Sequence, residues 1–254
     1  MRSELQGKTA LVTGASRGIG AAAAIALARG GAARVIVHYG SQREGAEGTA
    51  AAVRSAGAEA RLLGADLSRE EGIAAFTGAL RDTAPDVDIL VNNAGSLVRR
   101  AGLTEATPEL FDEVYNLNVK SVWFITQAVA PHMIARGSGV IVNLSSIAAR
   151  NGGGPGATMY ASAKAAVAAI TKGWAKELAP HGIRVNAVSP GTVDNDFHRK
   201  FSNREILANV VKATPQGRLS TNEDIADVIV FLCSDASRNI IGQTIEVNGG
   251  AFLV

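Results

Sequence analysis

The chain has 254 residues, of which 47% are apolar and 19% charged, and its formal net charge is +2 at pH 7. This near balance of charge argues against nucleic acid or an anionic membrane surface as a partner. The composition is that of a globular protein, and the length suits one large domain or two small ones.

The N-terminal sequence MRSELQGKTALVTG has no apolar signal segment before its first glycine, and no apolar run reaches the ~18 residues of a membrane span. Cys233 is the single cysteine, so no intramolecular disulfide forms, and a buried apolar role is the simplest interpretation. The four histidines lack metal-ligand spacing. We therefore expect a cytoplasmic protein with no metal site and no membrane segment.

Short β-branched runs alternate with longer alanine-rich stretches along the chain. We expect strands at 8–13, 34–39, 59–66, 87–93, 139–145, 183–189 and 243–248, and helices at 18–30, 42–56, 69–83, 117–136, 159–180 and 222–234. Several strands are apolar throughout, which is typical of strands covered on both faces. The pattern predicts a Rossmann-type, doubly wound, seven-stranded parallel sheet in a three-layer α/β/α arrangement, as a single domain over 1–254.

The first predicted strand runs into TGASRGIG, residues 13–20. Gly14 can adopt the positive φ needed to leave the strand sharply. Gly18 and Gly20 would let the backbone approach a pyrophosphate at a helix N-terminus. The spacing is G-x-x-x-G-x-G rather than the commoner G-x-G-x-x-G, but its place between strand and helix favours nucleotide binding over an ordinary glycine turn.

The fourth predicted strand ends in DILVNNAG. Asn92, Asn93, Ala94 and Gly95 would lie at the carboxyl edge of the sheet, against the adenosine half of a dinucleotide. An asparagine-rich turn that caps the strand is an equally good interpretation. Asp66, in GADLS, ends the third strand and would accept a hydrogen bond from adenine, or else serve as a helix N-cap.

Tyr160 and Lys164, in MYASAK, share one helix face with Cβ atoms roughly 5–6 Å apart. An ammonium at that distance lowers a tyrosine pKa from its usual value of about 10. The small residues between them leave the face open to a ligand. Spacing alone also allows a surface pair with no role. The polar, poorly periodic segment 191–221 is expected to be irregular, as functional lids often are.

TGxxxGxG, NNAG, the serine pair Ser145–Ser146, YxxxK and SPG occur in this order over essentially the whole chain. In these motifs the sequence resembles the short-chain dehydrogenase/reductase family, and most of all its 3-oxoacyl-[acyl-carrier-protein] reductases. The ending IIGQTIEVNGGAFLV also resembles the family's last strand and tail. The motifs are specific for the family but not for a substrate.

The resemblance implies a role for each of four residues. Tyr160 would be the general acid in carbonyl reduction, and Lys164 would hold the nicotinamide ribose and lower the tyrosine pKa. Ser146 would hydrogen-bond the carbonyl and stabilise the developing oxyanion. Asn118 would order a water on the proton path, or it is simply a buried helix residue bonded to backbone. Ser146 and Tyr160 are 14 residues apart, one more than expected, so Ser145 remains an alternative.

The resemblance also implies a nicotinamide cofactor along the carboxyl ends of the strands. The expected contacts are Gly14, Ser16, Arg17, Gly18, Ile19, Gly20, Tyr39, Ser41, Asp66, Leu67, Asn92, Ala94, Gly95, Tyr160, Lys164, Pro190, Gly191 and Thr192. NADP(H) is preferred over NAD(H), because residues 38–41 contain no acid to bind a ribose 2′-hydroxyl. Arg17 would contact the 2′-phosphate, helped by Ser41 and Arg43. A solvent-facing Arg17, with both cofactors accepted, is the alternative.

We therefore expect reduction of a ketone, either a 3-oxoacyl thioester or a small carbonyl compound, to a secondary alcohol. A sugar or polyol dehydrogenase is the alternative within the family. A dinucleotide-binding redox sensor is the non-enzyme alternative, although a sensor need not keep all four catalytic residues. An acyl carrier protein remains an open partner, because Arg136 is plausibly placed but His181 precedes GIRVN where a stronger cation is expected.

The segment at about 191–221 would form a substrate lid. A homotetramer is expected, because the helices at 117–136 and 159–180 carry apolar or small residues on more than one face. These residues include Val122, Trp123, Ile125, Val129, Ala165, Ala168, Ala169 and Trp174. Deeper burial of both helices inside one subunit is the alternative.

Overall fold

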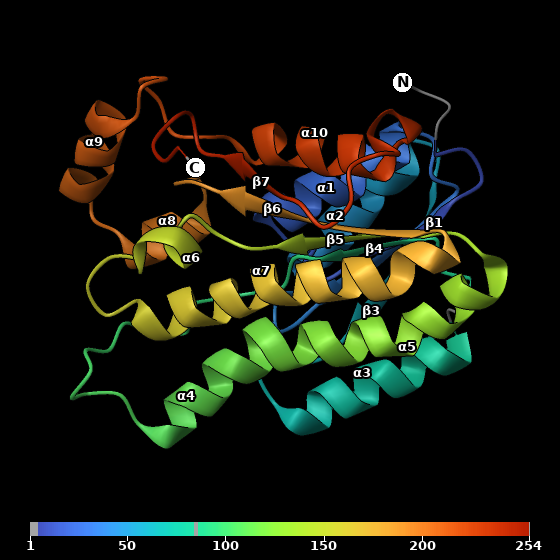
Figure 1. Ribbon diagram of the computed structural model, residues 1–254, viewed down its shortest axis with the longest axis horizontal. Coiled ribbons are helices and arrows are strands. Elements are labelled where there is room, and N and C mark those ends of the chain that lie inside the picture. Colours follow the sequence, from blue (N-terminus) through green and yellow to red (C-terminus); the bar gives the residue numbers. More distant parts are fainter. Residues whose placement is uncertain (1–4, 84–85, 254) are drawn as a thin grey trace.

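A parallel sheet runs through the centre of the computed structural model, which describes residues 5–83 and 86–253 (Figure 1). Its strands are β1 (Thr9–Val12), β2 (Arg34–Tyr39), β3 (Glu59–Gly64), β4 (Ile89–Asn92), β5 (Gly139–Leu144), β6 (Ile183–Pro190) and β7 (Thr244–Val247). All neighbours pair in parallel, in the order β3-β2-β1-β4-β5-β6-β7. The chain places β2 and β3 on one side of β1 and then β4 to β7 on its other side. This change of direction beside β1 confirms the predicted Rossmann-type, doubly wound sheet.

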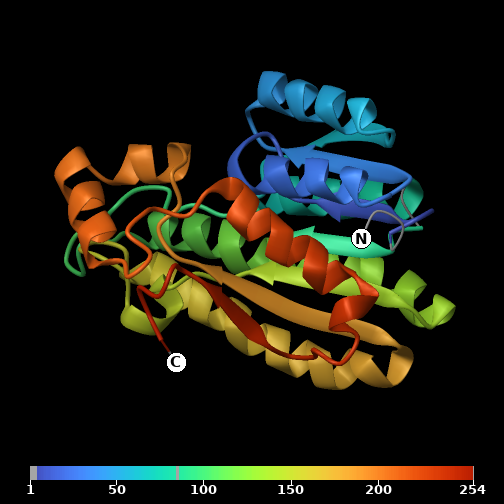
Figure 2. The same ribbon diagram turned by 90° about the horizontal axis from the view of Figure 1, so that it is seen from above.

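Helices cover both faces of the sheet (Figures 1 and 2). One layer contains α1 (Gly18–Arg29), α2 (Arg43–Ser55) and α10 (Asn222–Cys233), and the other contains α3 (Glu70–Thr83), α5 (Ser121–Arg136) and α7 (Thr158–Leu178). Along β1, Ala10 and Val12 pack into the first layer while Leu11 packs into the second. Strands buried on both faces need apolar side chains at every position, which explains their continuous apolar runs.

A buried polar network interrupts this apolar pattern between the sheet and its second helix layer. Asn92 Nδ2 donates to Thr126 Oγ1 on α5 at 3.0 Å and to Asn143 Oδ1 on β5 at 2.9 Å. Asn143 Nδ2 donates in turn to Thr171 Oγ1 on α7 at 2.9 Å. Buried amides must find partners, so the network fixes how both helices sit on the sheet.

Several helical segments lie outside the predicted elements. They are α4 (Pro108–Tyr115), α6 (Ala148–Asn151), α8 (Asp196–Phe201), α9 (Arg204–Ala213) and the short η3 (Asp235–Ser237). The short η1 (Asn116–Lys120) and η2 (Ala179–His181) fall at the start of the helix predicted at 117–136 and at the end of the helix predicted at 159–180. The expectation that 191–221 is irregular is therefore wrong for much of that segment. Asn195 and Asn203 cap α8 and α9 through side-chain oxygens that accept from His198 N and Ile206 N.

Within the described residues, no helix has both the length and the apolar character needed to cross a membrane. Cys233 is a free, buried thiol, and burial raises its pKa to about 12, which agrees with a packing role. A cytoplasmic location remains a prediction.

Candidate active site

The glycine-rich loop is joined to the end of β4 by contacts that leave no room for side chains. Gly14 has a φ of 62°, and a Cβ there would lie 2.9 Å from Ala94 Cα. A Cβ on Gly20 would lie 2.4 Å from Asn93 Nδ2. That amide donates to Thr13 O at 2.8 Å and Gly14 O at 3.0 Å. These contacts explain why the loop needs glycine and assign Asn93 a structural role in holding the loop.

His38 supports the same loop from β2, a role that the sequence alone did not indicate. Gly14 N donates to His38 Nδ1 at 3.0 Å, and His38 Nε2 lies 3.1 Å from Ala65 O at the end of β3. Because Nδ1 accepts, the proton of the neutral ring is on Nε2. Burial lowers the pKa of His38 to about 4, so the ring is neutral at pH 7.

The residues expected around the adenosine lie at the carboxyl ends of the first strands, with one exception. Asp66 Oδ1 accepts from Ser68 N at 3.0 Å and from Ser68 Oγ at 2.7 Å, which is a local turn contact. The Tyr39 ring lies against Gly64, where a Cβ would be 2.7 Å from Tyr39 Cζ. Ser41 is exposed and Leu67 buried. The exception is the side chain of Asn92, which points into the buried network.

The segment 191–221 contacts the glycine-rich loop through α8. Arg17 Nη1 lies 3.7 Å from Asp196 Oδ2, and both side chains are more than half exposed. Asn195 Nδ2 donates to Asn222 Oδ1 at 3.1 Å beside Gly18. Ser16 and Ile19 are half-buried within the loop. The guanidinium expected to bind a 2′-phosphate is thus paired with a carboxylate of the 191–221 segment.

Ser146 and Ser145 point in different directions at the end of β5. The Ser146 side chain lies near enough to the Tyr160 hydroxyl to lower the pKa of that hydroxyl. Ser145 is buried, and its Oγ donates to Lys164 O at 3.0 Å inside the fold. The structure therefore brings Ser146 to the tyrosine hydroxyl and gives Ser145 a helix-to-strand packing contact.

Burial dominates the titration of the tyrosine–lysine pair. It raises the pKa of Tyr160 to about 12, and the Ser146 side chain offsets this rise only in part. Burial also lowers the pKa of Lys164 to about 8. Lys164 Nζ is 5.7 Å from the Tyr160 ring centroid and donates to Leu144 O at 2.8 Å. The lowered tyrosine pKa expected from the spacing is therefore wrong, because burial disfavours the charged phenolate.

Asn118 lies in η1, a π-helical turn of a kind often found at functional sites. Its Nδ2 donates to Ser96 O at 2.9 Å and to Val114 O at 2.8 Å. Its Oδ1 is buried and has no hydrogen-bond partner among the described residues. A Cβ on Gly95 would lie 2.7 Å from that oxygen and 2.9 Å from Lys164 Nζ. An acceptor and an ammonium thus meet beside a glycine, an arrangement suited to a water and a ribose hydroxyl.

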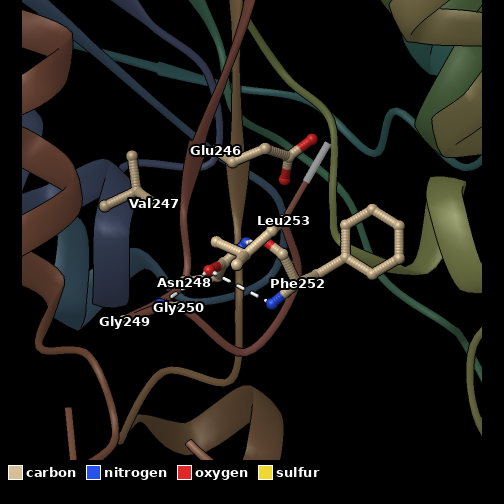
Figure 3. Close-up of a pocket in the computed structure, with 7 residues that line it drawn as sticks. All are labelled: Glu246, Val247, Asn248, Gly249, Gly250, Phe252 and Leu253. Carbon is tan, nitrogen blue, oxygen red and sulfur yellow. Dashed lines mark hydrogen bonds between the residues drawn. The ribbon is translucent and has the colours of Figure 1, made fainter. Parts of the chain in front are cut away.

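The C-terminal tail packs against the end of β6, where Pro190 is followed by Gly191 and Thr192. A Cβ on Gly191 would lie 2.8 Å from Asn248 Cβ. Asn248 folds the tail by accepting from Gly250 N at 3.0 Å and donating to Phe252 O at 2.9 Å (Figure 3). The tail surface around it has an open hollow of about 450 Å³. None of the predicted site residues lines that hollow, and Asn248 contacts the predicted site at Gly191.

Aromatic rings of α8 lie beside Tyr160, the predicted proton donor. The Phe197 ring centroid is 5.8 Å from that of Tyr160 and 5.1 Å from that of Phe201. A backbone bridge between Val193 and Ser220 closes the base of the 191–221 segment. In Figure 1, α6, α8 and α9 gather at one end of the molecule, together with the C-terminus. The segment therefore forms an apolar wall next to the predicted proton donor.

Known proteins match this chain along nearly its full length. Residues 14–251 match the family model described as Enoyl-(Acyl carrier protein) reductase. An uncharacterized oxidoreductase of Methylorubrum extorquens is 40% identical over 250 residues, covering 98% of this chain and 99% of the relative. The 3-oxoacyl-[acyl-carrier-protein] reductase FabG of Staphylococcus aureus is 37% identical over 246 residues, covering 97% of this chain and 98% of FabG.

A solved structure extends these matches to three dimensions. The gluconate 5-dehydrogenase from Burkholderia cenocepacia, in complex with NADP and tartrate, has a TM-score of 0.88 at 34% identity and covers 98% of this chain and 97% of its own. Fold and relatives together define a nicotinamide-dinucleotide oxidoreductase that acts on CH–OH or C=O groups. Within that class, the chain belongs to the short-chain dehydrogenase/reductase family, which confirms the resemblance seen in its motifs.

Proposed function

We propose that this enzyme uses NADPH to reduce a ketone to a secondary alcohol, with Tyr160 as the proton donor. The observation that carries the proposal is the position of the Ser146 side chain near the Tyr160 hydroxyl, whose pKa it lowers, with Lys164 Nζ 5.7 Å from the centroid of the same ring. The cofactor supplies the hydride that the carbonyl carbon accepts. The glycine contacts at Gly14 and Gly20 support a bound dinucleotide, since any side chain there would obstruct the loop.

The chain's own residues would handle the oxygen of the carbonyl group. Ser146 holds this oxygen, and Tyr160 transfers its phenolic proton to it as the carbon becomes tetrahedral. A pKa of about 12 keeps Tyr160 protonated before the reaction, which suits the reductive direction. Lys164 stabilises the phenolate that remains. Water at Asn118 Oδ1 would then return a proton through Lys164.

The preference for NADPH rests on charge around the ribose. Residues 38–41 at the end of β2 include no carboxylate that would repel a 2′-phosphate. Arg17 lies in the glycine-rich loop after β1, and Ser41 lies just after β2, so both follow strands that end at this edge of the sheet. Arg43 Nε is already paired with Glu47 Oε1 at 2.9 Å. The related gluconate 5-dehydrogenase was solved with NADP, which further supports this choice.

Two substrate classes follow from the relatives. FabG is named as a reductase of 3-oxoacyl groups held by an acyl carrier protein, whereas the gluconate 5-dehydrogenase is named for a sugar acid. We infer that a 3-oxoacyl thioester or another small carbonyl compound is reduced here, with a sugar or polyol as the alternative and with carrier-protein use left open. The 191–221 segment would act as the lid over this substrate, because Phe197 lies beside Tyr160.

A substrate panel with both cofactors tests the proposal. The panel contains 3-oxoacyl thioesters, keto acids and ketoses, assayed with NADPH and NADH. Tyr160→Phe should lower kcat by about 10²–10⁴ while cofactor Kd and Tm stay close to wild type, because only the acidic hydroxyl is lost. Near-normal turnover by this variant would refute the assignment. Cofactor binding without turnover of any ketone or alcohol would instead favour a redox sensor.

A further inference from the structure

Arg100 ties together the segments that surround the catalytic tyrosine. Its Nε donates to Phe201 O at the end of α8 at 3.0 Å, and its Nη1 donates to Pro155 O at 2.6 Å in the loop before α7. A Cβ on Gly156 would lie 3.0 Å from Arg100 Cβ, so the two loops pack closely. A guanidinium is thereby held at the junction of the loop after β4, the loop before α7 and the 191–221 segment.

No carboxylate neutralises Arg100 within residues 5–83 and 86–253, and its Nη2 donates no hydrogen bond there. The neighbouring cations differ in this respect. Arg199 pairs with Asp194 at 3.0 Å and with Asp196 at 3.1 Å. Arg150 pairs with Glu246 at 3.0 Å. Arg100 therefore keeps both its charge and part of its hydrogen-bonding fork available for a ligand.

The imidazole of His198, on α8 near Arg100, is a second polar group without a hydrogen-bond partner in the described part of the chain. It is half-buried on α8, edge-on to the Phe197 ring with centroids 5.1 Å apart. Burial, assisted by the charge of Arg100, lowers the pKa of His198 to about 4. A neutral imidazole offers one donor and one acceptor, which suits a hydroxyl group.

Phe197 lies near both His198 and Tyr160, and so indicates where Arg100 and His198 are relative to the predicted reaction site. Its ring centroid is 5.8 Å from that of Tyr160 and 5.1 Å from that of His198. Arg100 bonds to Phe201, whose ring is also 5.1 Å from Phe197. A substrate that presents its carbonyl to Tyr160 and runs along this ring would bring its far end toward Arg100 and His198.

We propose that Arg100 and His198 form a subsite for the carboxylate and a neighbouring hydroxyl of the substrate. The preferred substrates are then hydroxy-keto acids of a few carbons, with the carboxylate at the end remote from the ketone. A planar guanidinium fork matches a carboxylate, and the spacing of one aromatic ring suits a short acid. The phosphate of a phosphopantetheine thioester is also anionic but lies much farther from its reacting carbonyl. This inference rests on the proposed ketone reduction at Tyr160.

The test compares substrate pairs that differ only in charge. Each keto acid is assayed beside its neutral methyl ester, and a 3-oxoacyl phosphopantetheine thioester provides the third arm. Arg100→Gln keeps hydrogen-bond donors for the loop carbonyls but removes the charge, and Arg99→Gln at the exposed neighbouring position is the matched control. We expect Arg100→Gln to lower kcat/KM about 10- to 100-fold for the acid alone, with the ester unchanged. Arg99→Gln should behave as wild type.

A binding measurement separates this inference from the proposed function. Calorimetry with tartrate and wild-type enzyme should detect binding that Arg100→Gln loses and Arg99→Gln retains, whether or not turnover is found. If Arg100→Gln lowered kcat/KM equally for acid and ester, Arg100 would only hold the loops together, and the proposed subsite would be wrong. A wild-type preference for the ester or for the phosphopantetheine thioester would overturn it too. Failure of every ketone, with tartrate binding intact, would refute only the reaction.

Discussion

Two adjacent serines after β5 make different contacts, and single substitutions should separate their roles. Ser146→Ala removes the group that meets the Tyr160 hydroxyl, so we expect kcat to fall by about 10²–10³ with little change in stability. Ser145→Ala removes a buried hydrogen bond to Lys164 O, so it should cost about 1 kcal/mol of stability. Turnover and urea unfolding of both variants provide the check. A larger loss of turnover in Ser145→Ala would make Ser145 the catalytic serine.

His38 should make stability depend on pH. Its pKa is about 4 in the folded protein and 6.5 unperturbed, so the unfolded chain binds the extra proton first as pH falls. Its contribution is therefore complete above pH 6.5 and is lost as pH drops toward 4, by up to about 3 kcal/mol. Urea unfolding at pH 7.5 and pH 5 measures the effect.

His38→Asn is the control for that measurement, because asparagine can still accept from Gly14 N but does not titrate. The variant should show a flatter pH dependence than wild type. The pKa of His198 is also lowered, so the same measurement on His198→Asn gives the part of the pH dependence that His198 contributes. An unchanged slope in His38→Asn would show that this imidazole is not the titrating group.

At the scale of elements, the contact between α8 and the glycine-rich loop bears on cofactor choice. Arg17→Ala should lower kcat/KM with NADPH about 10- to 100-fold and leave the value with NADH nearly unchanged, because only the 2′-phosphate contact is lost. Asp196→Asn breaks the 3.7 Å ion pair but keeps the guanidinium, so the preference for NADPH should remain. A wild-type preference for NADH, or no loss with NADPH in Arg17→Ala, would contradict the assignment.

Elements with a strong local pattern were predictable, and others were not. The alternation of β-branched and alanine-rich runs identified all of the strands of the sheet and the helices that pack on it. The helices α8 and α9 contain no buried residue, and α8 is too short to show a helical period. However, α9 carries an apolar stripe that the prediction from sequence missed, formed by Ile206, Leu207, Val210 and Val211. For α4, Thr107 caps the helix and Pro108 occupies its first turn, a start signal that was available in the sequence.

The site is a property of the whole molecule, and this limits what motifs alone can predict. The order of motifs predicts which residues face a cofactor, but motifs do not report contacts between distant loops. His38 and Gly14 are 24 residues apart, and the contact of Asn248 with Gly191 joins the tail to β6. The raised pKa of Tyr160 likewise depends on burial by segments from several parts of the chain. Such effects need the folded arrangement.

The outer surface of α4 and α5 bears on the predicted homotetramer. Val122, Ile125, Val129 and Trp174 are buried within the subunit, so these residues no longer argue for a partner. Phe111, Trp123 and Phe124 remain 44%, 45% and 40% exposed, and the Phe111 ring stacks on Tyr115 with centroids 4.4 Å apart. Exposed aromatic side chains gathered on two consecutive helices are typical of a surface that another protein covers.

We expect light scattering of the wild type to give four times the 26.1 kDa chain mass. Trp123→Glu places a charge on the exposed α5 surface, so it should shift the mass toward dimers or monomers while each subunit stays folded. Leu103→Glu is the matched control, because Leu103 is 96% exposed and lies outside the helices. It should leave the assembly unchanged. A wild-type monomer at micromolar concentration would refute the homotetramer, and dissociation by both variants would place the interface elsewhere.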